Sequence, residues 1–378
     1  MNAFIVAARR TAVAPRGGAL AAIEPAELAV ATIRAVLADA GLAPEQIDDV
    51  ILGNALYGGG NPARLAALLA GLPEDVPALT LDSQCCAGLD AVMLAATRVA
   101  AGEANAIVAA GVESFSRAPI RLHRPTNKDE TLREYARPPF TPWPERDPDM
   151  IAAAAALAGA RGITRQAQES FAVESHRKAR TAAQGDVFDR EIVPVAGLAR
   201  DAFTRELTPA LCARLPALCG DDAHAVTAAT VAVEADAAAA VLVVGEDLAA
   251  RLARGARPVR VLGGARRGGD PAMPGLAPIA AARAALARND LTVEAVAVAE
   301  IMEAFAAQAI AGIDGLGLDP ARVNRGGGAL ARGHPIGASG AILAVRLWHE
   351  LQQEELGAAG LATIAAAGGL GSALLMRS

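Results

Sequence analysis

The feature that most constrains this 378-residue sequence is an internal repeat whose two copies are 249 positions apart. Residues 29–55 resemble residues 280–304, and Leu37 pairs with Leu286 at this offset. Both segments have the apolar periodicity of an amphipathic helix, followed by a short connection and the apolar run of a strand. The repeat predicts a duplicated domain in which each copy contributes the same elements.

The same offset continues downstream and brings two chemically active residues into equivalent places. It pairs Gly88 with Gly337 and Cys85 with His334. Each half shows the order helix, strand, glycine-containing turn, apolar helix and strand, which is an α/β pattern. Cys85 and His334 each stand at the start of the apolar helix of their half. We therefore expect the two side chains to meet near a pseudo-twofold axis between the halves.

The length of the chain exceeds what one hydrophobic core usually holds. We expect residues 1–118 together with 236–250 to form an N-terminal half, and residues 251–378 to form a C-terminal half. Residues 119–235 differ in character, because they contain the proline-rich and charged stretch "RPPFTPWPERDP". We interpret this segment as a loop domain that covers the site, a common use of long connections in enzymes.

Composition narrows the range of possible functions. Hydrophobic residues make up 53% of the chain and charged residues 20%, which indicates a folded protein. The net charge of −6 gives no support for nucleic-acid binding. The longest nearly uncharged segment is well short of the ~20 residues that span a bilayer. The four cysteines match neither a disulfide scaffold nor a zinc site, so we expect a cytoplasmic protein with no metal and no membrane partner.

Cys85 and Cys86 stand side by side in the stretch "DSQCCAGLDAV". A free cysteine is more often buried apolar packing than a nucleophile, which needs a helix N-terminus or a nearby base. Cys85 has both, because it precedes a predicted helix and is paired with His334, and this favours a nucleophile and its base. For Cys86 core packing is favoured. We interpret the acidic residues Asp82, Asp90 and Glu113 as helix-end or surface charges.

Several motifs carry a resemblance to a known family. They are "QCCAGLDAV" (84–92), "MPGLAPIAAARAAL" (273–286), "GHPIGASG" (333–340) and "AAGGLGSALL" (366–375). Over essentially its whole length the chain resembles the thiolase family of acyl-CoA acyltransferases. The resemblance selects Cys85 rather than Cys86, because the family's nucleophile lies three residues before a Gly-Leu pair. It implies a duplicated five-layer αβαβα fold, a loop domain over the pocket, and a homodimer or homotetramer.

The resemblance also implies a mechanism. His334 would activate Cys85, which takes an acyl group from a coenzyme A thioester, and a second thiol or an acyl-CoA enolate would then collect that group. Backbone N–H groups of Cys85 and Ala367 would stabilise the oxyanion. Coenzyme A enters as a substrate, and no other cofactor is implied. The expected substrate contacts are Met150, Met273, Phe305 and Ala228. For the two methionines, core packing is an alternative role.

Three positions depart from the family pattern. Ala365 stands where the family carries a second cysteine that acts as acid and base. Met302 replaces an asparagine that holds a water for the thioester oxygen, and a thioether accepts hydrogen bonds only weakly. Ala232 replaces a serine that contacts coenzyme A. These departures predict an atypical member.

Three functions therefore stay open. The first is a thiolase-type acyltransferase acting by thiolysis or condensation of 3-ketoacyl-CoA and acetyl-CoA. The second is a thioesterase or ketosynthase-like enzyme that transfers the acyl group to an acceptor other than coenzyme A. The third is a catalytically weak interaction subunit with a thiolase fold. The intact Cys85 and "GHPIGASG" motif favour catalysis, and we predict the first function.

Overall fold

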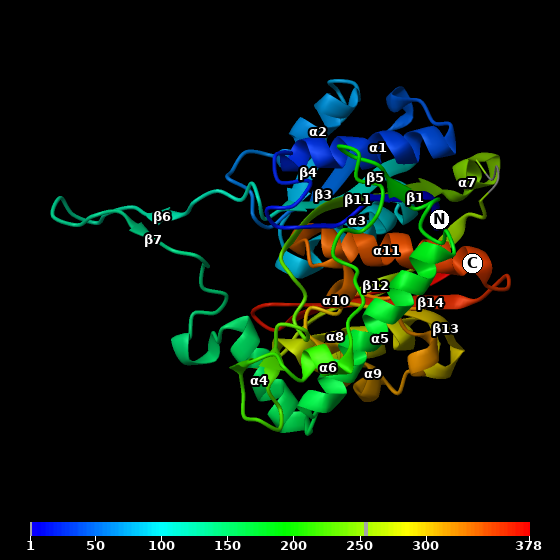
Figure 1. The fold of residues 1–378 in the computed structure, drawn as a ribbon. Coiled ribbons are helices and arrows are strands. Elements are labelled where there is room, and N and C mark those ends of the chain that lie inside the picture. The colour runs from blue at the N-terminus through cyan, green and yellow to red at the C-terminus, as the bar shows by residue number, and fades with distance from the viewer. Residues whose placement is uncertain (1, 253–255) are drawn as a thin grey trace.

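The computed structural model describes residues 2–252 and 256–378, and within these ranges eleven strands form one mixed sheet (Figure 1). Its strand order is β13-β14-β15-β12-β1-β11-β5-β3-β4, with β2 and β8 attached to β11 and β1. The strands are β1 (Ala3–Thr11), β2 (Ala14–Pro15), β3 (Asp49–Gly53), β4 (Ala78–Leu81), β5 (Ala106–Ser114), β8 (Ile192–Val193), β11 (Ala235–Gly245), β12 (Val259–Gly268), β13 (Val296–Ile301), β14 (Ala359–Ala366) and β15 (Leu370–Arg377).

The sheet consists of two parts with the same topology. In the N-terminal part, β1 and β11 pair antiparallel, as do β11 and β5, whereas β5 and β3 are parallel. In the C-terminal part, β12, β15, β14 and β13 repeat this antiparallel, antiparallel, parallel order. A short antiparallel pairing of β1 with β12 joins the two parts. The strands thus repeat as the sequence predicts.

Helices separate and cover the two parts of the sheet, which gives five layers (Figure 1). Helices α1 (Pro25–Ala40) and α2 (Pro62–Ala70) cover the N-terminal strands. Helices α8 (Ala277–Arg288) and α9 (Ala306–Leu316) lie on the outer side of the C-terminal strands. Between the two parts lie α3 (Ala87–Ala100) and α11 (Ile336–Gln353), whose first residues are separated by the repeat offset. The predicted five-layer fold is confirmed.

The two central helices approach each other closely because small residues face each other. A Cβ atom added at Gly88 would lie 2.6 Å from the backbone nitrogen of Ala341. One added at Gly340 would overlap the backbone of Leu89. A side chain at either position would therefore force α3 and α11 apart, and with them the two residues that precede these helices.

Residues 119–235, the predicted loop domain, form a segment inserted in the chain between β5 and β11. The strands β6 (Leu122–His123) and β7 (Arg133–Glu134) pair antiparallel in a long hairpin that projects from the molecule (Figure 1). Apart from β8, which joins the main sheet beside β1, the other helices and strands of this segment are α4 (Met150–Arg161), α5 (Arg165–Gln184), α6 (Pro209–Cys212), β9 (Ala217–Cys219) and β10 (Val226–Thr227). Helix α4 packs on α9, and α5 packs on both α9 and α10 (Ala329–Arg332).

One further helix, α7 (Glu246–Leu252), follows β11. In the described ranges, none of the helices has both the length and the apolar character needed to cross a membrane.

Candidate active site

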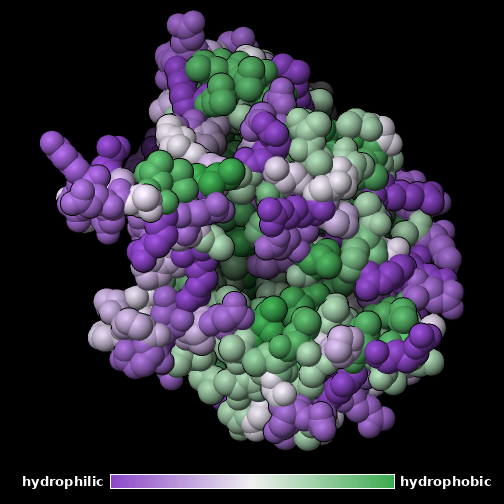
Figure 2. All heavy atoms as spheres, turned by 60° about the vertical axis from the view of Figure 1, so that its left-hand side comes forward, coloured by the Kyte–Doolittle hydropathy of each residue, from purple (hydrophilic) through white to green (hydrophobic). Residues whose placement is uncertain are grey.

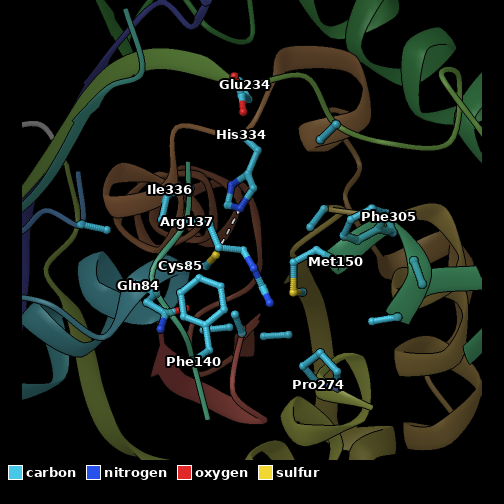
Figure 3. Close-up of a pocket in the computed structure, with 18 of the residues that line it drawn as sticks. Gln84, Cys85, Arg137, Phe140, Met150, Glu234, Pro274, Phe305, His334 and Ile336 are labelled. Carbon is cyan, nitrogen blue, oxygen red and sulfur yellow. Dashed lines mark hydrogen bonds between the residues drawn. The ribbon is translucent and has the colours of Figure 1, made fainter. Parts of the chain in front are cut away.

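Cys85 and His334 lie together, as the repeat predicts. Cys85 belongs to a short 3₁₀ turn, Gln84–Cys86, directly before α3, and His334 stands two residues before α11. The Nε2 atom of His334 is 3.3 Å from the Sγ atom of Cys85 (Figure 3). Each half of the duplicated fold thus contributes one member of a thiol–imidazole pair.

The contact at Nδ1 determines which ring nitrogen of His334 carries the proton. Its Nδ1 atom is 2.7 Å from the Oγ atom of Ser339, and the Ser339 hydroxyl donates to the carbonyl of Pro335 at 3.0 Å. Because that hydroxyl proton is already engaged, Ser339 accepts the proton on Nδ1. The Nε2 atom is then left without a proton and accepts from the Cys85 thiol. Ser339 was missed in the sequence, although it lies one helical turn into α11.

Burial holds the pair in its neutral form. It lowers the pKa of His334 to about 4. Burial also raises the pKa of Cys85 to about 12, and the negative charges of Glu113 and Asp82 contribute to this increase. A helix start favours a thiolate, but the cost of burying a charge outweighs that effect here. The pair is therefore a neutral thiol beside a neutral imidazole, and Nε2 of His334 lies within reach of the thiol proton at 3.3 Å from Sγ.

The turn before α3 separates the two neighbouring cysteines. Gln84 has a φ of +57°, a left-handed conformation that is uncommon for a residue with a side chain, and its N–H donates to Asp82 Oδ1 at 2.8 Å. Cys85 borders the cavity, whereas Cys86 is buried and its Sγ atom is 3.6 Å from the carbonyl oxygen of Ile364. Strain of this kind is typical of functional sites, where the surrounding fold enforces it.

A cavity of about 430 Å³ opens beside Cys85 and His334 (Figure 3). Three of the expected substrate-side residues, Met150, Phe305 and Ala367, line it. Ala367 reaches the wall because Gly368 and Gly369, with φ values of +74° and +78°, turn the chain at the end of β14. Most other lining side chains are apolar, and they come from both halves and from the inserted segment.

Two expected contact residues lie outside this lining. Ala228 is exposed in the turn after β10. Met273 packs against an apolar cluster that includes Leu157 and Ala307, and it is the next residue, Pro274, that borders the cavity. The family resemblance placed both residues near the site, but the turns that follow β10 and precede α8 direct them elsewhere.

The three departures from the family pattern occupy different environments. Ala365 and Ala232 line the cavity, so a methyl group stands at each of these positions in the wall. Met302 is 1% exposed and belongs to the core between the halves, and its N–H donates to the carbonyl of Thr363 at 3.0 Å. Met302 is thus a core residue in this protein and does not border the cavity.

Glu113 is a functional candidate that sequence reasoning placed only loosely, as a helix-end or surface charge. It is fully buried at the end of β5 and accepts a hydrogen bond from the N–H of Gly337, at 3.0 Å, in the first turn of α11. It also accepts from Asn54 Nδ2 at 2.7 Å and from the N–H of Ala55 at 3.1 Å. Burial raises the pKa of Glu113 to about 7. This carboxyl ties the helix that follows His334 to the N-terminal half.

The inserted segment contributes polar side chains to the cavity as well. The Arg137 guanidinium lies 3.0 Å from Asp147 Oδ1 and over the ring of Phe140, and both Arg137 and Phe140 line the cavity (Figure 3). The proline-rich stretch that contains them was the only signal in the sequence. Among the described residues, no group of three or more His, Cys, Asp or Glu side chains is arranged to hold a metal ion.

Almost the whole described chain is similar to a known protein family. The model of the thiolase N-terminal domain matches residues 3–247, and that of the thiolase C-terminal domain matches residues 257–378. The chain belongs to the thiolase family. This confirms the family predicted from the motifs, and it confirms an acyltransferase as the class of enzyme.

Individual thiolase relatives cover almost the whole chain. It is 41% identical to an acetyl-CoA acetyltransferase of Cupriavidus necator, over 99% of this chain and 98% of the relative. It is 39% identical to a putative acetyl-CoA C-acetyltransferase, YhfS, of Bacillus subtilis, over 99% of each chain. Among solved structures, the chain is similar to human mitochondrial 3-ketoacyl-CoA thiolase in complex with CoA, with a TM-score of 0.91 at 28% identity. The match covers 100% of this chain and 98% of the human chain. The acetyl-CoA acetyltransferase of Bacillus anthracis has a TM-score of 0.90 at 32% identity, with the same coverage.

Proposed function

We propose that this thiolase takes acyl groups from coenzyme A thioesters and holds them covalently on Cys85, with His334 as the base. The observation that carries the proposal is the 3.3 Å contact between the thiol and an unprotonated Nε2 atom at the edge of a cavity. The relatives named as acetyl-CoA acetyltransferases support coenzyme A thioesters as the donors. Acetyl-CoA and 3-ketoacyl-CoA are the donors to test first.

In the acylation step, the Cys85 thiol proton moves to Nε2 of His334 while the sulfur attacks the carbonyl carbon of the thioester. The negative charge then develops on the former carbonyl oxygen. Backbone N–H groups of Cys85 and Ala367, which both border the cavity, are the proposed donors to that oxygen. Collapse of the intermediate breaks the bond to the coenzyme A sulfur, which takes the proton back from His334.

The lining of the cavity suits the apolar portions of such a donor. Met150, Phe305 and Phe140 provide broad apolar surfaces for an acyl chain or the pantetheine arm. We propose these three as substrate contacts, together with the methyl group of Ala232. No other cofactor enters the proposed reaction.

We also propose that the protein assembles through its N-terminal half. Strand β4 ends the sheet, and an unpaired edge strand is a ready site for pairing with another chain. Large apolar side chains are exposed on and beside it, and Figure 2 shows such side chains gathered at the top of the molecule, in the region of α2. They are Leu65, Leu68, Leu69 and Leu79. This surface fits a homodimer, and the projecting β6–β7 hairpin offers a second contact for a homotetramer; a cytoplasmic location stays a prediction.

Intact-protein mass spectrometry tests the proposed function. The protein is exposed briefly to acetyl-CoA or to a longer 3-ketoacyl-CoA, and any adduct is assigned by peptide mapping. We expect an acyl adduct on Cys85, which Cys85→Ala abolishes and the matched control Cys86→Ala retains. An adduct on Cys86 would overturn the choice of nucleophile, and no adduct with either donor would favour a non-catalytic interaction subunit.

A further inference from the structure

We propose that His334 serves both half-reactions and that the acyl group leaves Cys85 for a thiol, so that this thiolase exchanges acyl groups between thiols and does not form or break bonds at the α-carbon of a thioester. The inference rests on the proposed acyl–enzyme at Cys85. It concerns the acceptor, which the geometry of the acylation step leaves open.

Few groups in the cavity can move protons. Among the described residues that line the cavity, the side chains that ionise are Asp82, Cys85, Arg121, Arg137, Glu234 and His334. The arginines stay charged and cannot accept a proton. Asp82 and Glu234 are exposed to solvent; Asp82 accepts the N–H of Gln84, and Glu234 pairs with Arg16 at 2.9 Å. Among these described lining residues, His334 is thus the one base that is not exposed to solvent.

The wall of the cavity at the end of β14 carries no acid or base. Ala365, Ala366 and Ala367 line the cavity in succession, and each presents no more than a methyl group and backbone. A substrate carbon that lies against this wall finds no side chain that can remove or deliver a proton. The position at which the family pattern places a second acid–base cysteine is therefore chemically inert here.

Thiol exchange needs only the pair already present. In acylation the departing sulfur of coenzyme A receives the proton that His334 took from Cys85. By microscopic reversibility, an incoming thiol that occupies the position of the departed coenzyme A sulfur can give its proton to Nε2 of His334 while its sulfur attacks the acyl carbon. The new carbon–sulfur bond forms, the bond to Cys85 breaks, and the Cys85 sulfur takes the proton back from His334. Atoms and charges balance, and no further group takes part.

Reaction at carbon makes a different demand. Condensation requires a base to remove a proton from the α-carbon of the acceptor, and cleavage of a 3-ketoacyl chain requires an acid to protonate that carbon. The ring of His334 is held by Ser339 at 2.7 Å and directed at Cys85 at 3.3 Å. The α-carbon of a thioester is a much weaker acid than a thiol, and the lowered pKa of His334 makes its imidazole a weak base for such a proton. The geometry thus supports proton transfer at sulfur.

The cavity also favours a thiol over water as the acceptor. Apolar side chains such as Leu56, Phe115 and Phe140 dominate its lining, and these offer few hydrogen bonds to hold an attacking water. The passage that admits the pantetheine arm of the donor serves equally for the arm of an incoming pantetheine thiol. We therefore infer a thiol of this type as the acceptor.

An isotope experiment on the full-length protein tests the inference. The enzyme is incubated in D₂O with acetyl-CoA and isotopically labelled coenzyme A. Mass spectrometry then measures entry of the label into acetyl-CoA, deuterium at the acetyl carbon, acetoacetyl-CoA and free acetate. We expect label exchange to exceed deuterium uptake and acetoacetyl-CoA formation by about 100-fold or more, which is what a missing general base typically costs.

Two cysteine variants locate the missing group. Ala365→Cys is expected to raise deuterium uptake at the acetyl carbon at least tenfold. Ala153→Cys, which places a thiol on another wall of the same cavity, is the matched control and is expected to give no increase. The wild-type ratio of exchange to deuterium uptake decides the inference even where a variant fails to fold.

The outcomes separate this inference from the proposed function. Deuterium uptake or acetoacetyl-CoA formation at a rate similar to label exchange would overturn the inference and leave the acyl–enzyme intact. Release of free acetate faster than label exchange would also overturn it, in favour of hydrolysis. Loss of both the Cys85 adduct and label exchange would instead overturn the proposed function itself.

Discussion

The neutral state of Cys85 predicts an unusual reactivity toward alkylating agents. With the pKa of the thiol near 12, about one molecule in 10⁴ carries a thiolate at pH 8. An ordinary thiol with a pKa of about 8.5 is about one-quarter ionised at that pH. Since the thiolate is the nucleophile, Cys85 should react with iodoacetamide about 10³-fold more slowly than glutathione at pH 8. The rate should rise about tenfold per pH unit throughout the range 7 to 10.

Peptide mapping after timed exposure to iodoacetamide measures this rate at each pH, with glutathione in the same tube as the reference. Acylation by acetyl-CoA should behave differently, because in the proposed acylation step His334 takes the proton during attack. With the pKa of His334 near 4, the imidazole is already neutral at pH 6, so acylation should vary little between pH 6 and 9. Fast alkylation that changes little over this range would refute the argument, because it would indicate a thiolate paired with a protonated His334.

Three further predictions concern the helix α11 and the core. Ser339→Ala removes the hydrogen-bond partner of His334 Nδ1 and should slow acylation about tenfold, which corresponds to the loss of one neutral hydrogen bond. The KM for the donor should change little. An unchanged rate would mean that packing alone orients His334. Gly340→Ala should lower the free energy of unfolding, measured in urea, by about 1–3 kcal/mol because its Cβ would overlap Leu89. Gly312→Ala in α9 is the control and should not lower it, since an added Cβ there meets no atom within 4 Å. Equal effects of the two substitutions would contradict the packing argument. Glu300 is buried with both carboxyl oxygens lacking a hydrogen-bond partner among the described residues, and burial raises its pKa to about 7. Because Glu300 ionises more readily in the unfolded chain, the fold loses stability as pH rises from 4.5 to 7. Glu300→Gln should therefore stabilise the protein by up to about 3 kcal/mol at pH 8 and by little near pH 4.5. A stabilisation that does not depend on pH in thermal unfolding would count against this account.

The duplicated core and the Cys85–His334 pair could be predicted from the sequence for a physical reason. The central helices are packed through glycine and alanine, and that requirement preserves small residues at matching positions in both halves, as at Gly88 and Gly337. Once the repeat is recognised, equivalent helix starts place the two residues together without knowledge of any other contact. Periodicity and spacing therefore carry the information.

The rest of the site depends on contacts that spacing does not encode. Glu113 is buried because β5 ends against the first turn of α11, a contact between residues 224 positions apart. The family resemblance placed Met302 and Ala228 at the site, whereas the course of the chain after β13 and β10 decides where they lie. The left-handed conformation of Gln84 likewise follows from tertiary packing, since glutamine has no preference for it.

The walls of the cavity come from parts of the chain that differ in how many substitutions they tolerate. Cys85 and His334 are supplied by the two halves, whose close helix packing tolerates few substitutions. Phe140 and Met150 belong to the inserted segment, which packs on the outside of the C-terminal half. If the cavity holds the acyl group as proposed, variation in that segment reshapes the set of accepted acyl groups and leaves Cys85 and His334 unaltered. Laboratory evolution of new substrate ranges should find most of its productive substitutions between residues 119 and 235.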